Sequence, residues 1–352
     1  MKGWKGMTDR QTKARHERAR AWPWSARLLA AGLACAAALP VHAAERIRVM
    51  VGGIEKQIYL PATLAERLGY FKEQGLDVVL LTEPSGVNAE DELLAGSVQG
   101  VVGFYDHTID LQAKGKLVQS VVQFAQSPGE VELVATQLAA QVRSPADFKG
   151  RHLGITGFGS STHFLTHYLA LTHGLKAGDL KLRAVGSGAT FAQALKLGHI
   201  DAGMTTEPTV SQLLASGDAR VLIDLRTPRS AEKLLGGGYP AACLYMTTLW
   251  INTHKVQVQK LANALVKTMR FIDTHSAEEI SALMPAEFYA GDRALYVEAL
   301  RNGMPMFTPD GRMPADGPRT VLRVLNVVSK VVHGKTIDLS KTYTTEFVGA
   351  AR

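Results

Sequence analysis

Apolar runs alternate along this chain with stretches whose apolar residues recur every three or four positions. Residues 46–53 (RIRVMVGG) and 76–82 (LDVVLLT) are typical of strands, and the second run indicates a strand covered on both faces. Residues 60–71 between them have helical spacing, with Pro61 in the first turn and Gly69 near the end. A short helix at 89–97 and strands at 98–106 and 117–125 follow. This order predicts a mostly parallel α/β sheet.

A second series repeats the order of the first. Its strands are expected at residues 152–156, 180–186 and 200–206, and its helices at 161–174, 190–198 and 209–217. Residues 89–103 and 190–204 correspond closely, since each is an apolar helix, a glycine and a short strand. The repetition predicts two similar α/β lobes, each with a mostly parallel sheet flanked by helices.

The remaining third of the chain is predicted to return to the first lobe. It contains a strand from residue 242, an amphipathic helix at 258–275 and further helices to residue 332. We therefore expect two crossings, at 132–137 and 239–245, which would form a hinge beside an interlobe cleft. Lobe 1 would comprise 45–138 plus 243–352, and lobe 2 would comprise 139–242.

The positive charge of the chain is concentrated at its N-terminus. Of 39 Lys/Arg and 32 Asp/Glu, eight and two fall in residues 1–44, so these carry +6 of the formal +7. The nearly neutral remainder argues against nucleic acid as a partner. The basic segment precedes an apolar stretch at 28–39 and the small residues Val41 and Ala43, which predicts a signal peptide over 1–43 and a periplasmic location. An uncleaved anchor or a lipid on Cys35 are the alternatives. Cleavage would leave only Cys243, which excludes an intrachain disulfide.

Four segments, taken in order, resemble a known family. They are LAERLGYFKEQGLDVVLL (64–81), LLAGSVQGVVGFYD (93–106), SPADFKGRHLGITGFGSSTHFL (144–165) and ALKLGHIDAGMTTEPTV (194–210). They are similar to substrate-binding proteins of ABC importers of the nitrate/sulfonate/taurine type, a branch of the type II periplasmic binding proteins. The same superfamily includes binders of thiamine-precursor pyrimidines.

The resemblance implies a binding module rather than an enzyme. A monomer would capture a small organic anion or zwitterion such as taurine, and deliver it to an ABC permease in the inner membrane, without cofactor or metal. An aminopyrimidine is the alternative ligand. A pyrimidine-synthesis enzyme of the same fold is a second alternative, but its cysteine-rich segment and cytoplasmic role are not matched here. A sensor that presents its ligand to a membrane kinase is a third.

A glycine-rich turn followed by hydroxyls marks the strongest candidate for ligand binding. Gly159, Ser160, Ser161 and Thr162 follow the strand at 152–156 and begin a helix. The first N–H groups of a helix lack intrahelical partners and can bind an anion. The alternative is that one hydroxyl serves only as an N-cap. The resemblance supports ligand contacts at this helix start.

Further candidates follow the carboxyl ends of other strands, where α/β proteins bind ligands. They are Gln57, Tyr59, Ser85, Gly86, Tyr105, Asp106, Glu207 and, near the second crossing, Tyr239. Asp106 and Glu207 would attract an amino group and repel a bare anion. Where sulfonate binders commonly have Trp-Asp-Pro, this chain has Thr206-Glu207-Pro208, so a tyrosine would have to supply an aromatic wall.

Overall fold

The computed structural model describes residues 46–289 and 291–351, which belong to one compact unit. The predicted signal peptide lies outside the described residues. Within the described ranges, no helix is both long and apolar enough to cross a membrane.

The first sheet contains the strands that the first apolar series predicts, and one more from the end of the chain. Its order is β2-β1-β3-β10-β4. β1 pairs in parallel with β2 and β3, whereas β10 runs antiparallel to β3 and β4. The strands are β1 (Arg46–Val51), β2 (Asp77–Thr82), β3 (Gly100–Phe104), β4 (Val118–Gln123) and β10 (Ala242–Thr247).

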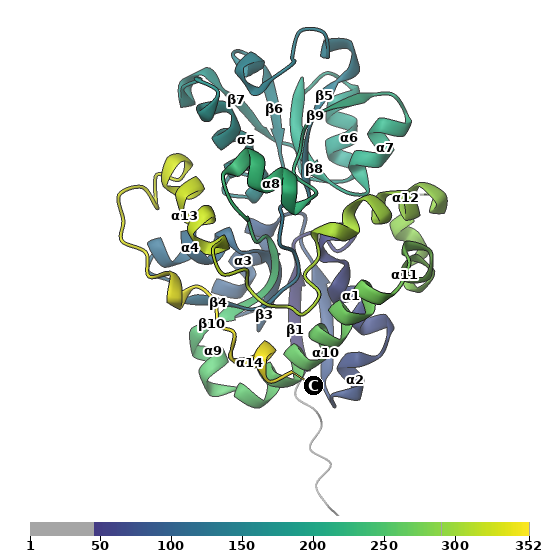
Figure 1. The fold of residues 1–352 in the computed structure, drawn as a ribbon, viewed down its shortest axis with the longest axis vertical. Helices are drawn as coiled ribbons and strands as arrows, with labels where there is room; N and C mark the ends of the chain where they lie inside the picture. The colour runs from purple at the N-terminus through teal and green to yellow at the C-terminus, as the bar shows by residue number, and fades with distance from the viewer. Residues whose placement is uncertain (1–45, 290, 352) are drawn as a thin grey trace, which may run out of the picture. The chain divides into compact units, whose positions relative to one another are not determined.

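The second sheet has the same arrangement, in the order β7-β6-β8-β5-β9. β6 pairs in parallel with β7 and β8, and β5 is the antiparallel strand between β8 and β9. The strands are β5 (Glu130–Ala135), β6 (His152–Ile155), β7 (Lys181–Ala184), β8 (Ala202–Thr206) and β9 (Ala219–Asp224). The fold is therefore the expected two-lobed α/β architecture, with one antiparallel strand inside each sheet (Figure 1).

The chain crosses between the sheets at residues 124–129 and 236–241. The first crossing lies earlier than the predicted residues 132–137, because β5 already pairs with β8 of the second sheet. A bend at residues 126–127 and the pair Pro128–Gly129 precede β5, and Gly129 has a φ of +64°, which other residues adopt at a cost. A lobe boundary at residue 138 would thus place β5 in the sheet to which it does not pair.

Helices cover both faces of the first sheet, because its strands alternate their side chains between two apolar cores. Ile47, Val49 and Val51 of β1 belong to the core that contains α1 and α10, whereas Met50 faces the core of α3, α4 and α13. The helices around this sheet are α1 (Leu60–Arg67), α2 (Tyr70–Glu73), α3 (Gly86–Leu94), α4 (Asp106–Ala113), α9 (Thr248–Thr253), α10 (Lys255–Thr274), α11 (Ala277–Leu283), α12 (Arg293–Gly303), α13 (Gly317–Val328) and α14 (Glu346–Gly349).

The second sheet lies between α5 on one face and α6 and α7 on the other, and α8 leads to the second crossing. These helices are α5 (Ser161–Thr172), α6 (Ala189–Lys196), α7 (Thr209–Ala215) and α8 (Pro228–Leu235). The 3-10 turns are η2 (Gln57–Tyr59), η3 (Thr136–Leu138), η4 (Pro145–Phe148), η5 (Ala177–Asp179), η6 (Ala286–Tyr289), η7 (Met304–Met306) and η8 (Leu339–Lys341).

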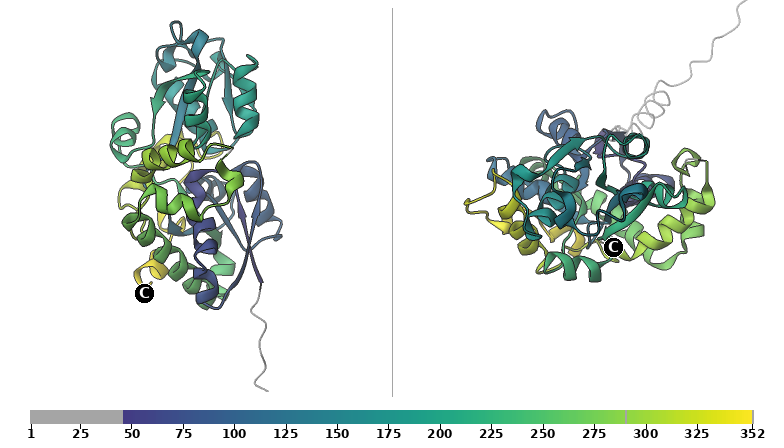
Figure 2. Two further views of the ribbon diagram at one scale, coloured as in Figure 1. Left: turned by 90° about the vertical axis from the view of Figure 1, so that its right-hand side faces the viewer. Right: turned by 90° about the horizontal axis from the view of Figure 1, so that it is seen from above.

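The two lobes meet through helices as well as through the crossings. α13 of lobe 1 packs against α5, and α12 packs against α7, as the views in Figures 1 and 2 illustrate. Phe164, Leu165 and Leu169 of α5 share one buried apolar cluster with Val321 and Val324 of α13. Apolar surface therefore holds the lobes together beside the crossings.

Candidate functional site

A small cavity lies between the lobes, at the carboxyl ends of the strands. Its volume is about 20 Å³, which is room for about one water molecule. Anything larger must therefore separate the lobes to enter. The lining residues are Lys56, Tyr59, Gly86, Phe104 and His107 from lobe 1, and Glu130, Thr156, Ser160, Ser161, Thr162 and Thr206 from lobe 2.

The hydroxyls at the start of α5 have different roles. Ser160 is the N-cap, since its Oγ accepts a hydrogen bond from the His163 N–H at 3.4 Å. Thr162 Oγ1 accepts from the Thr156 N–H at 2.9 Å and so ties the helix to the preceding turn. Ser161 instead donates to Glu130 Oε2 at 3.4 Å. Ser160 Oγ and Thr162 Oγ1 lie 2.8 Å apart and bond to each other, so Ser161 is the hydroxyl of this group that bonds to a lining side chain outside the group.

Two buried acids stand at this cavity. Glu130 lines it, and burial raises its pKa well above the usual range, with the nearby Asp106 acting in the same direction. Burial also raises the pKa of Asp106 to about 7, although the Tyr239 hydroxyl donates to its Oδ2 at 3.3 Å. The Asp106 Oδ1 atom is buried and has no hydrogen-bond partner among the described residues, and the Nε2 atom of the neutral His107 lies 3.8 Å from it. Both carboxyls would gain from a donor or a cation that a ligand brings.

Lys56 is the basic side chain at the cavity apart from the neutral His107. Its Nζ donates to the Gly52 carbonyl at 2.6 Å, and burial lowers its pKa, against the opposing influence of Glu55 and Glu130. The cavity therefore has one lysine and two nearby carboxyls. Because burial raises the pKa of both carboxyls, their charge repels a bare anion at a pH high enough to ionise them.

His107 connects the cavity to a second layer of polar groups. Its Nδ1 lies 3.2 Å from the Tyr245 hydroxyl and 3.7 Å from Glu90 Oε2. Burial lowers the pKa of His107 to about 4 and raises that of Glu90 to about 7. A Cβ at Gly86 would lie 2.7 Å from His107 Cε1, so the glycine makes room for the ring. His107 is thus a neutral, closely packed imidazole at the edge of the cavity.

The predicted site residues other than Glu207 divide into three groups. Tyr59, Gly86, Ser160, Ser161 and Thr162 line the cavity. Asp106 and Tyr239 are hydrogen-bonded to each other beside it.

The third group consists of turn, cap and packing residues. Ser85 caps α3, and Gly159, with a φ of +92°, shapes the turn before α5. Gln57 donates its side-chain amide to the Tyr296 carbonyl, away from the cavity. The Tyr105 hydroxyl bonds to Thr342 Oγ1 on the opposite side of β3.

Glu207 is engaged within lobe 2, although it was expected to offer its charge to a ligand. Its carboxylate accepts hydrogen bonds from Arg226 at 2.7 Å and from the Ser211 N–H at 2.9 Å. The backbone carbonyl of Glu207 instead accepts from the Gln57 N–H at 3.0 Å, which joins the lobes. Glu130, and not Glu207, is therefore the acid that lines the cavity next to Asp106.

Six lining residues were not among the sequence candidates: Lys56, Phe104, His107, Glu130, Thr156 and Thr206. Lys56 directly precedes the candidates at 57–59, and His107 follows Asp106, so a wider window at each strand end would have included them. Glu130 carried no such signal, because it begins a strand that was assigned to the crossing.

The fold and the cleft define a two-lobed protein with the periplasmic-binding-protein fold. A structure from Bordetella bronchiseptica RB50 is 35% identical and has a TM-score of 0.83, over 87% of this chain and 96% of that one. The alkanesulfonate-binding protein SsuA from Xanthomonas axonopodis pv. citri, bound to MOPS, is 17% identical with a TM-score of 0.68, over 85% and 98%. The periplasmic nitrate-binding protein NrtA from Synechocystis PCC 6803 is 13% identical with a TM-score of 0.70, over 87% and 88%.

The chain belongs to the NMT1/THI5-like family, whose model matches residues 58–278. Among curated relatives, the 4-amino-5-hydroxymethyl-2-methylpyrimidine phosphate synthase THI13 of Saccharomyces cerevisiae is 33% identical over 153 residues. The synthase of Aspergillus parasiticus is 34% identical over 155 residues. Each match spans 42% of this chain and 42% of the relative, so less than half of each curated relative is matched.

Proposed function

We propose that this protein is the extracytoplasmic solute-binding component of an ABC importer, and that it captures a small amino-bearing solute between its lobes. The leading candidate is an aminopyrimidine, and a taurine-like zwitterion is the second. The observation that carries the proposal is the pair of buried carboxyls, Glu130 and Asp106, at a cleft with a single lysine.

The carboxyls favour a ligand that donates hydrogen bonds. Among the described residues, Asp106 Oδ1 has no hydrogen-bond partner, and the Glu130 carboxyl receives only the long bond from Ser161. An exocyclic amine or a protonated ring nitrogen would satisfy both groups, whereas nitrate or a simple alkanesulfonate offers no donor.

Two aromatic side chains favour the heterocycle over the zwitterion. Tyr59 and Phe104 line the cavity, with ring centroids 6.2 Å apart and ring planes at 88°. Their faces and edges suit a flat ring. The names of the curated relatives, which are pyrimidine phosphate synthases, are in keeping with this choice.

The N-terminus of α5 favours a taurine-like solute. Its free N–H groups and positive dipole end would receive a sulfonate, while Glu130 and Asp106 received the amine. We therefore expect the site to discriminate between amino-bearing solutes and bare anions more strongly than between an aminopyrimidine and taurine.

Binding of a solute would require the lobes to separate first and then to close around it. The cavity is too small for either candidate, so the solute must enter an opened form and be enclosed as the lobes close again. A ligand that contacts Ser161 of one lobe and Asp106 of the other stabilises the closed form, because it binds that form more tightly.

Isothermal titration calorimetry tests the proposal with four solutes: 4-amino-5-hydroxymethyl-2-methylpyrimidine, taurine, ethanesulfonate and nitrate. We expect stoichiometric binding of at least one amino-bearing solute, and weaker or no binding of the two bare anions. Glu130→Gln should weaken the amino-bearing solute, because a bound cation favours the ionised carboxylate, which Gln cannot form. Glu232→Gln, an exposed change on α8, should not weaken it. Tight binding of nitrate that survives Glu130→Gln would contradict the charge argument.

The pH dependence provides an independent check with taurine, whose amine stays protonated at neutral pH. The pKa of Asp106 is about 7, so this carboxyl ionises as the pH rises from 6 to 8. Affinity for taurine should then increase over this range, and affinity for a bare anion should decrease.

An enzyme is the second candidate function, since the curated relatives are synthases. Product analysis after incubation with each solute distinguishes the two. Unchanged solute recovered in stoichiometric amounts supports the binding protein, and conversion of any of the solutes supports the enzyme.

A further inference from the structure

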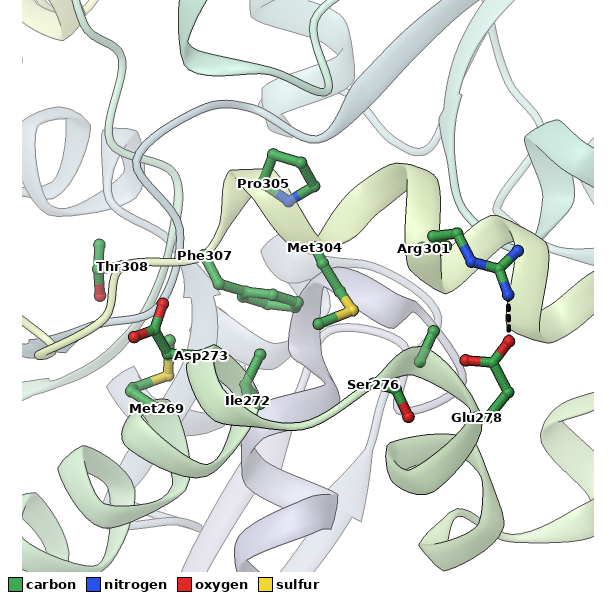
Figure 3. Close-up of a pocket in the computed structure, with 11 residues that line it drawn as sticks. Met269, Ile272, Asp273, Ser276, Glu278, Arg301, Met304, Pro305, Phe307 and Thr308 are labelled. Carbon is green, nitrogen blue, oxygen red and sulfur yellow. Dashed lines mark hydrogen bonds and ion pairs between the residues drawn. The ribbon is translucent and has the colours of Figure 1, made fainter.

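A second and larger pocket lies in lobe 1, where α10 ends and α11 begins, beneath the end of α12 and η7 (Figure 3). Its volume is about 460 Å³. Pockets that bind small organic molecules typically measure about 300–1,000 Å³. This pocket is therefore large enough for a ligand without movement of the lobes, unlike the interlobe cavity.

The lining combines an apolar floor with a charged mouth. Met269, Ile272 and Phe307 are buried beneath the pocket. In Figure 3, Ile272 and Phe307 lie between Asp273 on one side and the Arg301–Glu278 ion pair on the other. This order of side chains suits a molecule with an apolar body and a polar end.

The charges at the mouth favour a cation. Two carboxylates, Asp273 and Glu278, and one guanidinium, Arg301, lie among the lining residues, so their sum is −1. Glu278 is already paired with Arg301, whereas Asp273 has no ion pair within the described part of the chain. Asp273 is thus the charge that remains for a ligand.

One wall of the pocket is hydrogen-bonded to the first crossing. The Gln126 N–H donates to the Met306 carbonyl and the Thr308 N–H to the Phe124 carbonyl, each at 2.8 Å. Gln126 Nε2 also donates to the Phe307 carbonyl at 3.1 Å. A ligand that contacts Met304, Pro305 or Phe307 would therefore restrain the segment that holds residues 124–126 in place.

We propose that this pocket binds a small organic monocation with an apolar body, such as an arylalkylamine, and that its occupancy restrains the first crossing. The site is separate from the interlobe cavity and goes beyond the proposed function. Asp273 would receive the ammonium, while the floor formed by Met269, Ile272 and Phe307 would cover the apolar body.

Titration calorimetry on the full chain with 2-phenylethylamine, 2-phenylethanol and 3-phenylpropionate tests the ligand class. We expect the amine to bind more tightly than the neutral and anionic compounds. Asp273→Asn should weaken the amine about three- to fivefold, as for an exposed charge contact, and Asp91→Asn on α3 should leave it unchanged. Met304→Lys, which adds a cation at the mouth, should weaken it further.

A cleft variant separates this proposal from the proposed function. Amine binding should be unchanged in Glu130→Gln. Loss of amine binding in Glu130→Gln without any effect of Asp273→Asn would place the amine in the interlobe cavity and overturn the second site. Equal binding of all three compounds would overturn the monocation class.

Hydrogen exchange tests the link to the crossing without any cleft ligand. Saturating 2-phenylethylamine should slow exchange of the Gln126 amide, because its acceptor is the Met306 carbonyl. The same amide in Asp273→Asn at equal amine concentration is the control and should be protected less. An unchanged rate at Gln126 in the saturated protein would refute the restraint.

Discussion

Replacing Glu132 by Gln tests whether burial keeps the carboxyls inside this protein protonated. Glu132 lies on β5 and is fully buried, opposite Met204 of β8. Its Oε2 accepts one hydrogen bond, from Thr166 Oγ1 at 2.7 Å, and its Oε1 has no partner among the described residues. Burial raises the pKa of Glu132 from 4.5 to about 8, and the Thr166 hydroxyl opposes this only in part.

Proton binding by Glu132 makes the stability of the folded protein depend on pH. Between pH 4.5 and 8 the folded protein retains the Glu132 proton and the unfolded chain releases it, so the free energy of unfolding falls as the pH rises. A rise in pKa from 4.5 to about 8, at about 1.4 kcal/mol per pH unit, sets an upper bound of about 5 kcal/mol on this loss. Gln keeps the shape of the protonated side chain and does not titrate.

Denaturant unfolding at pH 5 and pH 9 measures the difference. At pH 5 Glu132→Gln should match the parent to within about 1 kcal/mol, because a neutral amide replaces a neutral acid in one hydrogen bond. At pH 9 the variant should be the more stable by several kcal/mol, up to the bound above. Glu232→Gln, an exposed change, should show no such pH dependence. A Glu132→Gln variant destabilised equally at both pH values would refute the reasoning, because the carboxylate would then be ionised and compensated.

Three further substitutions address packing, pairing and binding. Gly86→Ala should cost about 1–3 kcal/mol in thermal unfolding, because the new Cβ would lie 2.7 Å from His107 Cε1; a melting temperature equal to the parent's would contradict the close approach. Arg226→Met should cost about 3 kcal/mol, because Glu207 is almost fully buried and would lose its cation, and Glu207→Gln in the same background should recover part of this stability. Ser161→Ala should weaken solute binding by about 1–2 kcal/mol in calorimetry, and any loss of stability should come from its long hydrogen bond to Glu130, since its hydroxyl does not cap the helix; unchanged affinity would remove it from the site.

The repeated order of apolar runs was sufficient to predict two similar sheets, because buried parallel strands have nearly continuous apolar sequences. It was not sufficient to assign the antiparallel strand of the second sheet. Residues 130–135 read as a strand of either lobe, since periodicity describes a strand but not its partner. The pair Pro128–Gly129 was the local signal that the crossing had already occurred.

The site was predictable where one segment forms it and not where two segments meet. Ser160–Thr162 are recognisable from the glycine turn and the helix that follows. Glu130 and Lys56 are neighbours only because the lobes close on each other. Glu207 pairs with Arg226, which lies 19 residues further along the chain and follows another strand, so its charge could not be judged from its own surroundings.

The late position of β10 has a consequence for the order in which the chain acquires structure. All strands of the second sheet lie between Glu130 and Asp224, so that sheet can assemble from one contiguous segment. The first sheet needs β10, which leaves the ribosome only after the whole of that segment, and β4 cannot pair until it arrives. Closing so long a loop is slow. In a nascent chain truncated before residue 242, we therefore expect the second sheet to resist proteolysis, while β4 remains open to cleavage.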